Sequence, residues 1–163
     1  ISGERAARQA AAQLARAVHA RPVQQPVHGP AYHAAAALVA NGTAALASSG
    51  IRVLTHLGMG TRQATQTIAG LLRSVAQNVE QIGVPEALTG PIMRGDGATV
   101  KRHREALSSL PEVRETYEEA APSVLRCARE AGLPSDAVRR IRRALRADLP
   151  TTLLSTRTKN RRN

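Results

Sequence analysis

The chain has almost no aromatic side chains with which to fill a hydrophobic core. Among its 163 residues there is no Phe and no Trp, and Tyr occurs only twice. Its core must therefore be built from Ala, Leu, Val and Ile, and the smallest of these allow helices to approach one another closely. Because Ala also has the highest intrinsic helix propensity, the composition predicts closely packed helices. The length suits one domain with a hydrophobic core.

The pattern of apolar residues and helix breakers predicts an all-α helical bundle. Helix signals recur along the chain, and no alternating strand pattern follows residue 30. Pro111 opens one helix, and Pro122 inside it is expected to kink or split that helix. A short extended linker is expected at 22–30, and disorder in the basic tail at 150–163. The first expected helix, at 3–20, has Ser2 as its N-cap, and the last one is capped by Ser135 or Asp136 and ends near 147. A helical turn is expected within 51–60. The other expected helices cover 31–49, 61–82, 97–108 and 111–131.

The helix expected at 31–49 is apolar nearly all the way around, which is typical of a buried helix. We expect it to pack inside a homodimer, because so apolar a helix does not suit the outer face of a monomer. Its polar members His33 and Asn41 stand eight residues apart, so both can face the same side. Such a pair can hydrogen-bond a carbonyl group and relay a proton, which makes both residues catalytic candidates. The alternative is a core histidine with satisfied hydrogen bonds and an asparagine bonded to a neighbouring helix.

A loop dense in glycine and proline, at 83–97, precedes the helix expected at 97–108. The N-terminal end of a helix carries free N–H groups and partial positive charge, and therefore suits an anion. Arg94 adds a guanidinium fork for a carboxylate or phosphate. The alternative is a rigid turn in which Asp96 caps the helix and pairs with Arg94. The candidate substrate-binding residues of this region are Thr89, Gly90, Arg94, Asp96 and His103.

The formal net charge of +11 raises the question of nucleic-acid binding. The basic residues are almost all Arg, and richness in Arg and Ala together is typical of a GC-rich genome rather than of selection for phosphate contacts. Much of the excess follows residue 134, in a segment without aromatic stacking partners or a preceding helix-turn-helix pattern. A nucleic-acid-binding protein that uses the arginines at 139–146 is therefore the less favoured alternative.

Further sequence features narrow the class of protein. No run of 18 apolar residues and no signal-peptide pattern are present, so we expect no membrane contact. The single Cys127 cannot form an internal disulfide, which favours a reduced, cytoplasmic location. No HExxH, CxxC or His/Cys cluster indicates a metal site. No GxGxxG motif follows a strand, since Gly58-Met59-Gly60 lacks that context.

Two segments of the chain resemble a bacterial protein family. They are Tyr32-His33-Ala34-Ala35-Ala36 with Asn41, and Ala87-Leu-Thr-Gly-Pro-Ile-Met-Arg-Gly-Asp96 followed by Thr99, Val100 and His103. Together they look like the helical C-terminal domain of unknown function that follows a Rossmann-like domain in proteins similar to ketopantoate reductase, pyrroline-5-carboxylate reductase, and the 6-phosphogluconate and 3-hydroxyisobutyrate dehydrogenases. The resemblance covers about residues 22–132. It implies a bundle of the 6-phosphogluconate dehydrogenase C-terminal-domain type that dimerises through long buried helices.

The resemblance also implies a division of the chain and an activity. Residues 1–21 look like the end of a Rossmann-like domain, and residues 31–149 like a substrate and dimerisation domain. The nucleotide, NAD or more specifically NADP, would be bound mainly by the Rossmann-like half, with the small-molecule substrate in the cleft between the halves. The implied reaction is reduction of a small 2-oxo acid, ketopantoate first, or of an imine. The 163 residues alone are then expected to be inactive.

One position departs from the pattern of these dehydrogenases. Asn41 matches their asparagine, but the catalytic lysine one helical turn earlier is replaced by Ala37. His33, one further turn back, is the candidate replacement. The departure also supports a second hypothesis, a non-catalytic helical dimer or scaffold. A GxGxxG strand–turn–helix upstream in the complete gene product would favour the reductase over the scaffold.

Overall fold

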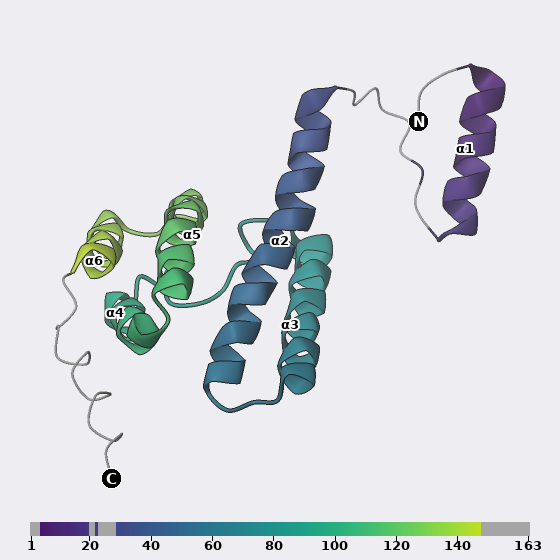
Figure 1. Ribbon diagram of the computed structural model, residues 1–163. Coiled ribbons are helices and arrows are strands. Elements are labelled where there is room, and N and C mark those ends of the chain that lie inside the picture. The colour runs from purple at the N-terminus through teal and green to yellow at the C-terminus, as the bar shows by residue number, and fades with distance from the viewer. Residues whose placement is uncertain (1–3, 20–21, 23–28, 148–163) are drawn as a thin grey trace, which may run out of the picture. The chain divides into compact units, whose positions relative to one another are not determined.

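The computed structural model of the chain describes residues 4–19, 22 and 29–147, and all regular structure within these ranges is helical (Figure 1). The expected all-α class is therefore confirmed for the described residues. The expected N-cap Ser2, most of the expected linker at 22–30 and the expected tail at 150–163 lie outside them. The helices are α1 (Arg5–Ala17), α2 (Pro30–His56), α3 (Thr61–Ile82), α4 (Gly97–Ala106), the 3₁₀ helix η1 (Leu107–Ser109), α5 (Pro111–Glu130) and α6 (Ser135–Arg146).

The chain divides into two compact units, Ile1–Ala44 and Ala45–Asn163, and the division falls inside α2. The first unit contains α1, which has no buried residue and no side-chain capping bond at its N-terminal end. This helix is shorter than the one expected at 3–20. It ends before His19, whose φ of 57° lies in the left-handed region and cannot continue a right-handed helix.

α2 is one unbroken helix of 27 residues, so the expected helix end at 49 is wrong and the helical turn expected within 51–60 belongs to α2. The Ser49 hydroxyl donates to the carbonyl group four residues earlier (3.4 Å), so this polar residue does not interrupt the helix. Gly50 allows α3 to approach closely, because a Cβ atom there would lie 2.9 Å from Cδ1 of Ile68. The expected break follows at Gly58, which has a φ of 94°.

The expected burial of α2 is not found, because none of its residues is buried by the described chain. Leu38 and Val39 are 75% and 67% exposed, and the apolar stripe of α3 is open as well, for example at Leu71 and Val75. An apolar helix is buried only where a second surface covers it. The described residues provide no such surface.

α2 is also the one helix within the described ranges that is long and apolar enough to cross a membrane. The expectation of no membrane contact rested on the absence of an unbroken apolar run. A helix whose polar residues are mostly uncharged can still have high average hydropathy over 18 residues. The criterion rests on length and composition only, and no part of the apolar window is buried in the described structure. The absence of membrane contact stays a prediction.

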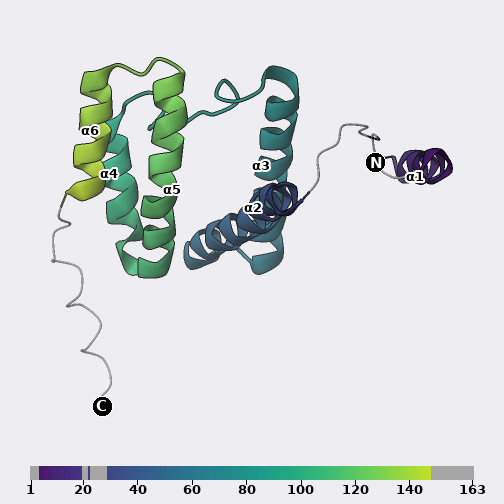
Figure 2. The same cartoon turned by 90° about the horizontal axis from the view of Figure 1, so that it is seen from above.

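The hydrophobic core of the second unit lies between α4, α5 and α6, which run side by side (Figure 1, Figure 2). Val100 on α4 and Ile141 on α6 are fully buried. Ala121 and Ala144 in this core allow the close helix approach that the aromatic-poor composition predicts. The buried core comprises Ile92, Val100, Ala121, Leu125, Val138, Ile141 and Ala144.

Two expectations for the C-terminal helices differ from the structure. α5 runs unbroken through Pro122, so the possible split at that residue does not occur. α6 begins at Ser135 with Pro134 in the N-cap position, and no side chain caps it, so the expected cap by Ser135 or Asp136 is wrong. Asp136 instead pairs with Arg140 one turn further along the helix.

Candidate functional site

The loop between α3 and α4 ends in a side-chain cap on α4. Asp96 accepts hydrogen bonds from the backbone N–H of Thr99 (2.9 Å) and from its hydroxyl group (2.6 Å). The hydroxyl bond first, and then the backbone bond, lower the pKa of the Asp96 carboxyl group below its ordinary value. The chain itself therefore supplies the negative charge that a helix N-terminus favours.

Two glycines let this loop lie directly against α6. Gly95 has a φ of 69°, and a Cβ atom there would lie 2.6 Å from the Cβ atom of Ala137. A Cβ atom on Gly97 would lie 3.0 Å from the carbonyl oxygen of Arg140. Packing and helix capping thus account for the Gly-Asp-Gly part of the motif. For these residues the structure has the rigid turn that the sequence analysis held as its alternative.

Arg94 and Glu86 are the exposed charged residues of the loop. The Arg94 side chain forms no hydrogen bond or ion pair within the described residues, so the direct pairing with Asp96 is not formed, and its charge only helps to lower the pKa of the Asp96 carboxyl group. The Arg94 backbone N–H donates to the carbonyl group of Gly90 (3.3 Å), where a φ of 104° turns the chain. Thr89 is exposed next to this turn. The turn therefore presents Arg94 and Thr89 to solvent, where an anion can reach them.

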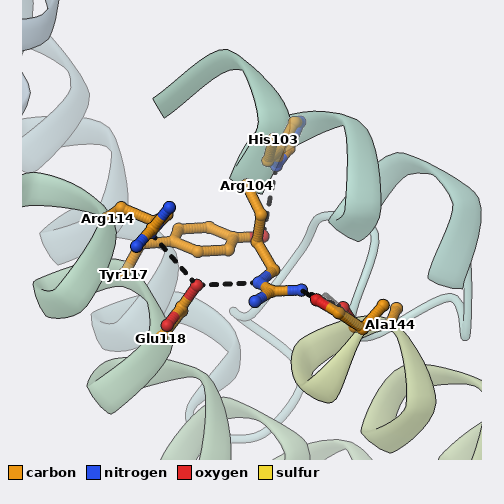
Figure 3. A network of polar contacts seen from close by, with 7 residues as sticks. His103, Arg104, Arg114, Tyr117, Glu118 and Ala144 are labelled. Atoms are coloured by element: carbon orange, nitrogen blue, oxygen red, sulfur yellow. Dashed lines mark hydrogen bonds and ion pairs between the residues drawn. The ribbon is translucent and has the colours of Figure 1, made fainter. Parts of the chain in front are cut away.

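A polar network that the sequence analysis missed joins α4, α5 and α6 (Figure 3). The Arg104 side chain is 8% exposed and donates from Nε to the Oε1 atom of Glu118 (2.7 Å). Its Nη1 atom donates to the carbonyl oxygens of Ala144 (2.8 Å) and Ala147 (2.7 Å). Arg114 Nε lies 3.6 Å from the same Glu118 oxygen. Because the last carbonyl groups of a helix lack partners, Arg104 caps the C-terminal end of α6.

His103 on α4 lies beside Tyr117 on α5 (Figure 3). The His103 Nδ1 atom is 3.2 Å from the Tyr117 hydroxyl oxygen, and the rings meet edge to face with centroids 5.8 Å apart. Burial raises the pKa of the Tyr117 phenol, against an opposing effect of Arg104. The phenol is therefore protonated at neutral pH and can donate to the imidazole. The sequence analysis named His103 but gave no role to Tyr117.

His33 and Asn41 lie on the part of α2 that belongs to the first unit, and both are exposed. The unbroken helix separates them by about 12 Å along its axis and about 80° around it. Both residues therefore lie on one broad face of α2, as expected. Their separation suits hydrogen bonds to two different groups of one ligand better than hydrogen bonds to one carbonyl group. The loop residues at 89–96 belong to the second unit, so the two sets of candidates are described separately.

The described residues thus define a helical domain with candidate polar groups on α2 and in the loop before α4. By sequence, the chain belongs to the family described as a domain of unknown function (DUF2520), whose sequence model matches residues 1–124. The match contains both sets of candidate residues and also residues 1–21, whose assignment to a Rossmann-like domain stays a prediction. No curated protein and no solved structure matches the chain significantly.

Asp96→Ala is expected to lower the thermal unfolding midpoint at pH 7 and to have a smaller effect in acid. Because folding lowers the pKa of this carboxyl group below 3.8, the carboxylate stabilises the fold above that pH, and this contribution is lost as the pH falls through the lowered pKa. Circular dichroism melts between pH 7 and about pH 2 measure the difference. Asp96→Asn keeps a capping oxygen and should lose less at pH 7. A difference between wild type and Asp96→Ala that does not change with pH would contradict this role of the carboxylate.

Proposed function

We propose that this chain is the substrate-binding and dimerisation domain of an NAD(P)-dependent oxidoreductase similar to the 6-phosphogluconate dehydrogenase superfamily. The observation that carries the proposal is α2, a long apolar helix that displays His33 and Asn41 and that no described residue buries. An exposed apolar surface of this kind suits an interface, and a few polar groups within apolar surroundings suit a small ligand. The proposed substrate is a small 2-oxo acid, ketopantoate first, or an imine.

Four of the candidate residues have a chemical role in this proposal. His33 is an exposed imidazole that can give a proton to the reduced oxygen or nitrogen atom. Asn41 donates from its side-chain amide to another group of the substrate, because its distance along α2 places it away from His33. Arg94, in the second unit, is by itself a candidate for binding a carboxylate through its guanidinium fork. Asp96 acts indirectly by fixing the turn before α4.

The described residues do not fit the nucleotide that this activity requires. Gly58-Met59-Gly60 joins two helices, α2 and α3, whereas a Rossmann phosphate loop joins a strand to a helix. We therefore assign NADP to a Rossmann-like domain outside the described residues and derive no step of the reaction from it. A cytoplasmic location belongs to the same proposal.

A second candidate function is a non-catalytic helical dimer or scaffold. The observation that favours it is Ala37, which stands on α2 where the dehydrogenases that this chain resembles carry a lysine. Both functions need the same dimer through α2, so oligomeric state does not separate them. NADPH-dependent turnover by the complete protein does, because only the reductase requires it.

The test of the reductase is NADPH consumption by the complete protein, with a panel of small 2-oxo acids and imines that begins with ketopantoate. Turnover is expected with at least one compound. His33→Ala should lower kcat by about 100-fold or more if the imidazole transfers the proton, and Asn41→Ala should lower kcat/KM. His56→Ala, at the other end of α2, is the matched control and should leave turnover unchanged.

The outcomes separate the two candidate functions. The isolated 163 residues should show no turnover with NADPH, because the described residues contain no Rossmann phosphate loop to hold the nucleotide against the substrate. NADPH binding without turnover of any compound would contradict the proposed substrate class. The absence of NADPH binding by the complete protein would overturn the reductase and favour the scaffold. Equal losses in His33→Ala and His56→Ala would contradict the assignment of the proton donor.

A further inference from the structure

Two adjoining hollows lie between α5 and α6, with volumes of about 710 Å³ and about 480 Å³. Arg126, Arg129 and Arg142 line both, so the two hollows adjoin along α5 and α6, and together they are here called the α5–α6 groove. Each volume lies in the range of small-molecule sites. None of the residues assigned to the proposed function lines this groove.

The walls of the α5–α6 groove carry positive charge that the described residues do not neutralise. Five arginines line it, and none of them forms an ion pair within the described ranges. Their one side-chain hydrogen bond there runs from Arg126 to the Ser123 hydroxyl (3.4 Å). Two carboxylates line the groove, those of Glu118 and Glu130. Glu118 already pairs with Arg104, so Glu130 is the one lining carboxylate that can offset the charge of these arginines. The five arginines are Arg126, Arg129, Arg139, Arg142 and Arg146.

An organic anion with several negative charges fits this groove. Guanidinium forks bind phosphate oxygens in pairs, and this surplus of arginines accommodates more charge than one carboxylate group carries. Apolar side chains between the arginines, including Leu125, Leu133 and Val138, suit the organic part of such a ligand. No aromatic side chain lines the groove, so it lacks the stacking surface of a single-stranded nucleic-acid site. We propose that the α5–α6 groove binds a small soluble organic anion that carries a diphosphate group.

This site goes beyond the proposed reductase function. All five arginines follow residue 124, where the match to the family ends, and they stand on α5 and α6. The proposed reductase residues lie on α2 and in the loop before α4. Binding of a diphosphate to the groove and turnover at the candidate site can therefore fail independently, and a binding measurement tests the groove alone.

The test is isothermal titration calorimetry of the full chain with ADP, AMP and inorganic pyrophosphate at one fixed ionic strength. ADP and pyrophosphate are expected to bind, and AMP should bind about tenfold or more weakly than ADP because it lacks the second phosphate. Arg129→Gln/Arg142→Gln removes two arginines shared by both hollows and should weaken ADP binding about tenfold or more. Arg140→Gln/Arg143→Gln removes the same charge from outside the groove and should change binding less than about twofold.

Three results would overturn the proposal. The first is the absence of any heat of binding with ADP and pyrophosphate at millimolar concentration. The second is an equal weakening of ADP binding by both double variants, and the third is an equal affinity for AMP and ADP. A DNA duplex is the competing ligand. If the duplex binds more tightly than ADP and loses that affinity in Arg129→Gln/Arg142→Gln alone, the groove is a nucleic-acid site instead.

Discussion

Arg104→Met is expected to lower the free energy of unfolding by about 2–4 kcal/mol. The substitution keeps an apolar stem but leaves Glu118 and the carbonyl groups of Ala144 and Ala147 without their donor. Removing one partner of a buried ion pair typically costs about 3–5 kcal/mol. The expected loss is smaller here because the Glu118 side chain is 31% exposed and retains Arg114 at 3.6 Å. Urea unfolding followed by circular dichroism measures the loss.

Arg52→Met is the matched control for this loss. Arg52 also lies 2.7 Å from a carboxylate, that of Glu112, but the two side chains are 51% and 74% exposed. Its replacement should therefore cost less than about 1 kcal/mol. Arg104→Lys keeps the charge without the fork, so an intermediate loss is expected. Equal losses in the two Arg→Met variants would show that the buried network contributes no more than a surface ion pair.

Most helix bounds of this chain are predictable because their signals are local. α3 has the expected bounds of 61–82, α4 begins after the Asp96 cap, and α5 begins at Pro111. The end of α2 was misplaced because the Ser-Ser-Gly run at 48–50 has the composition of a helix end. What keeps that run helical is partly tertiary, the close approach of α3 to Gly50, and a local pattern contains no such information.

The polar sites are less predictable because their contacts join distant parts of the chain. The glycine content of the sequence singles out the loop before α4. The structural requirement for glycine at position 95, however, is its close approach to Ala137 on α6. Arg104 stands four residues after the buried Val100, on the same face of α4, and that spacing is a signal that it points inward. Its carbonyl partners lie 40 and 43 residues further along the chain, beyond the range of any local signal.

The uncovered apolar surface of α2 predicts that the chain forms a homodimer. Leu38 and Val39 on this helix are 75% and 67% exposed, and nothing in the described residues covers them. Soluble monomers rarely expose a continuous apolar surface of this kind. A second copy presents the same surface, so a two-fold symmetric dimer covers both copies at once. Light scattering should then give twice the chain mass of 17.3 kDa.

Val39→Glu is expected to shift this dimer to the monomer. A carboxylate buried without a partner in an apolar interface costs several kcal/mol, so the dissociation constant should rise by about 100-fold or more. Ala106→Glu, at the exposed C-terminal end of α4, is the control because Ala106 belongs to no uncovered stripe of large apolar residues, and it should leave the mass unchanged. A wild-type mass of 17.3 kDa at all concentrations would contradict the dimer. Recovery of the wild-type chain only from detergent-extracted membranes would assign the surface of α2 to lipid instead.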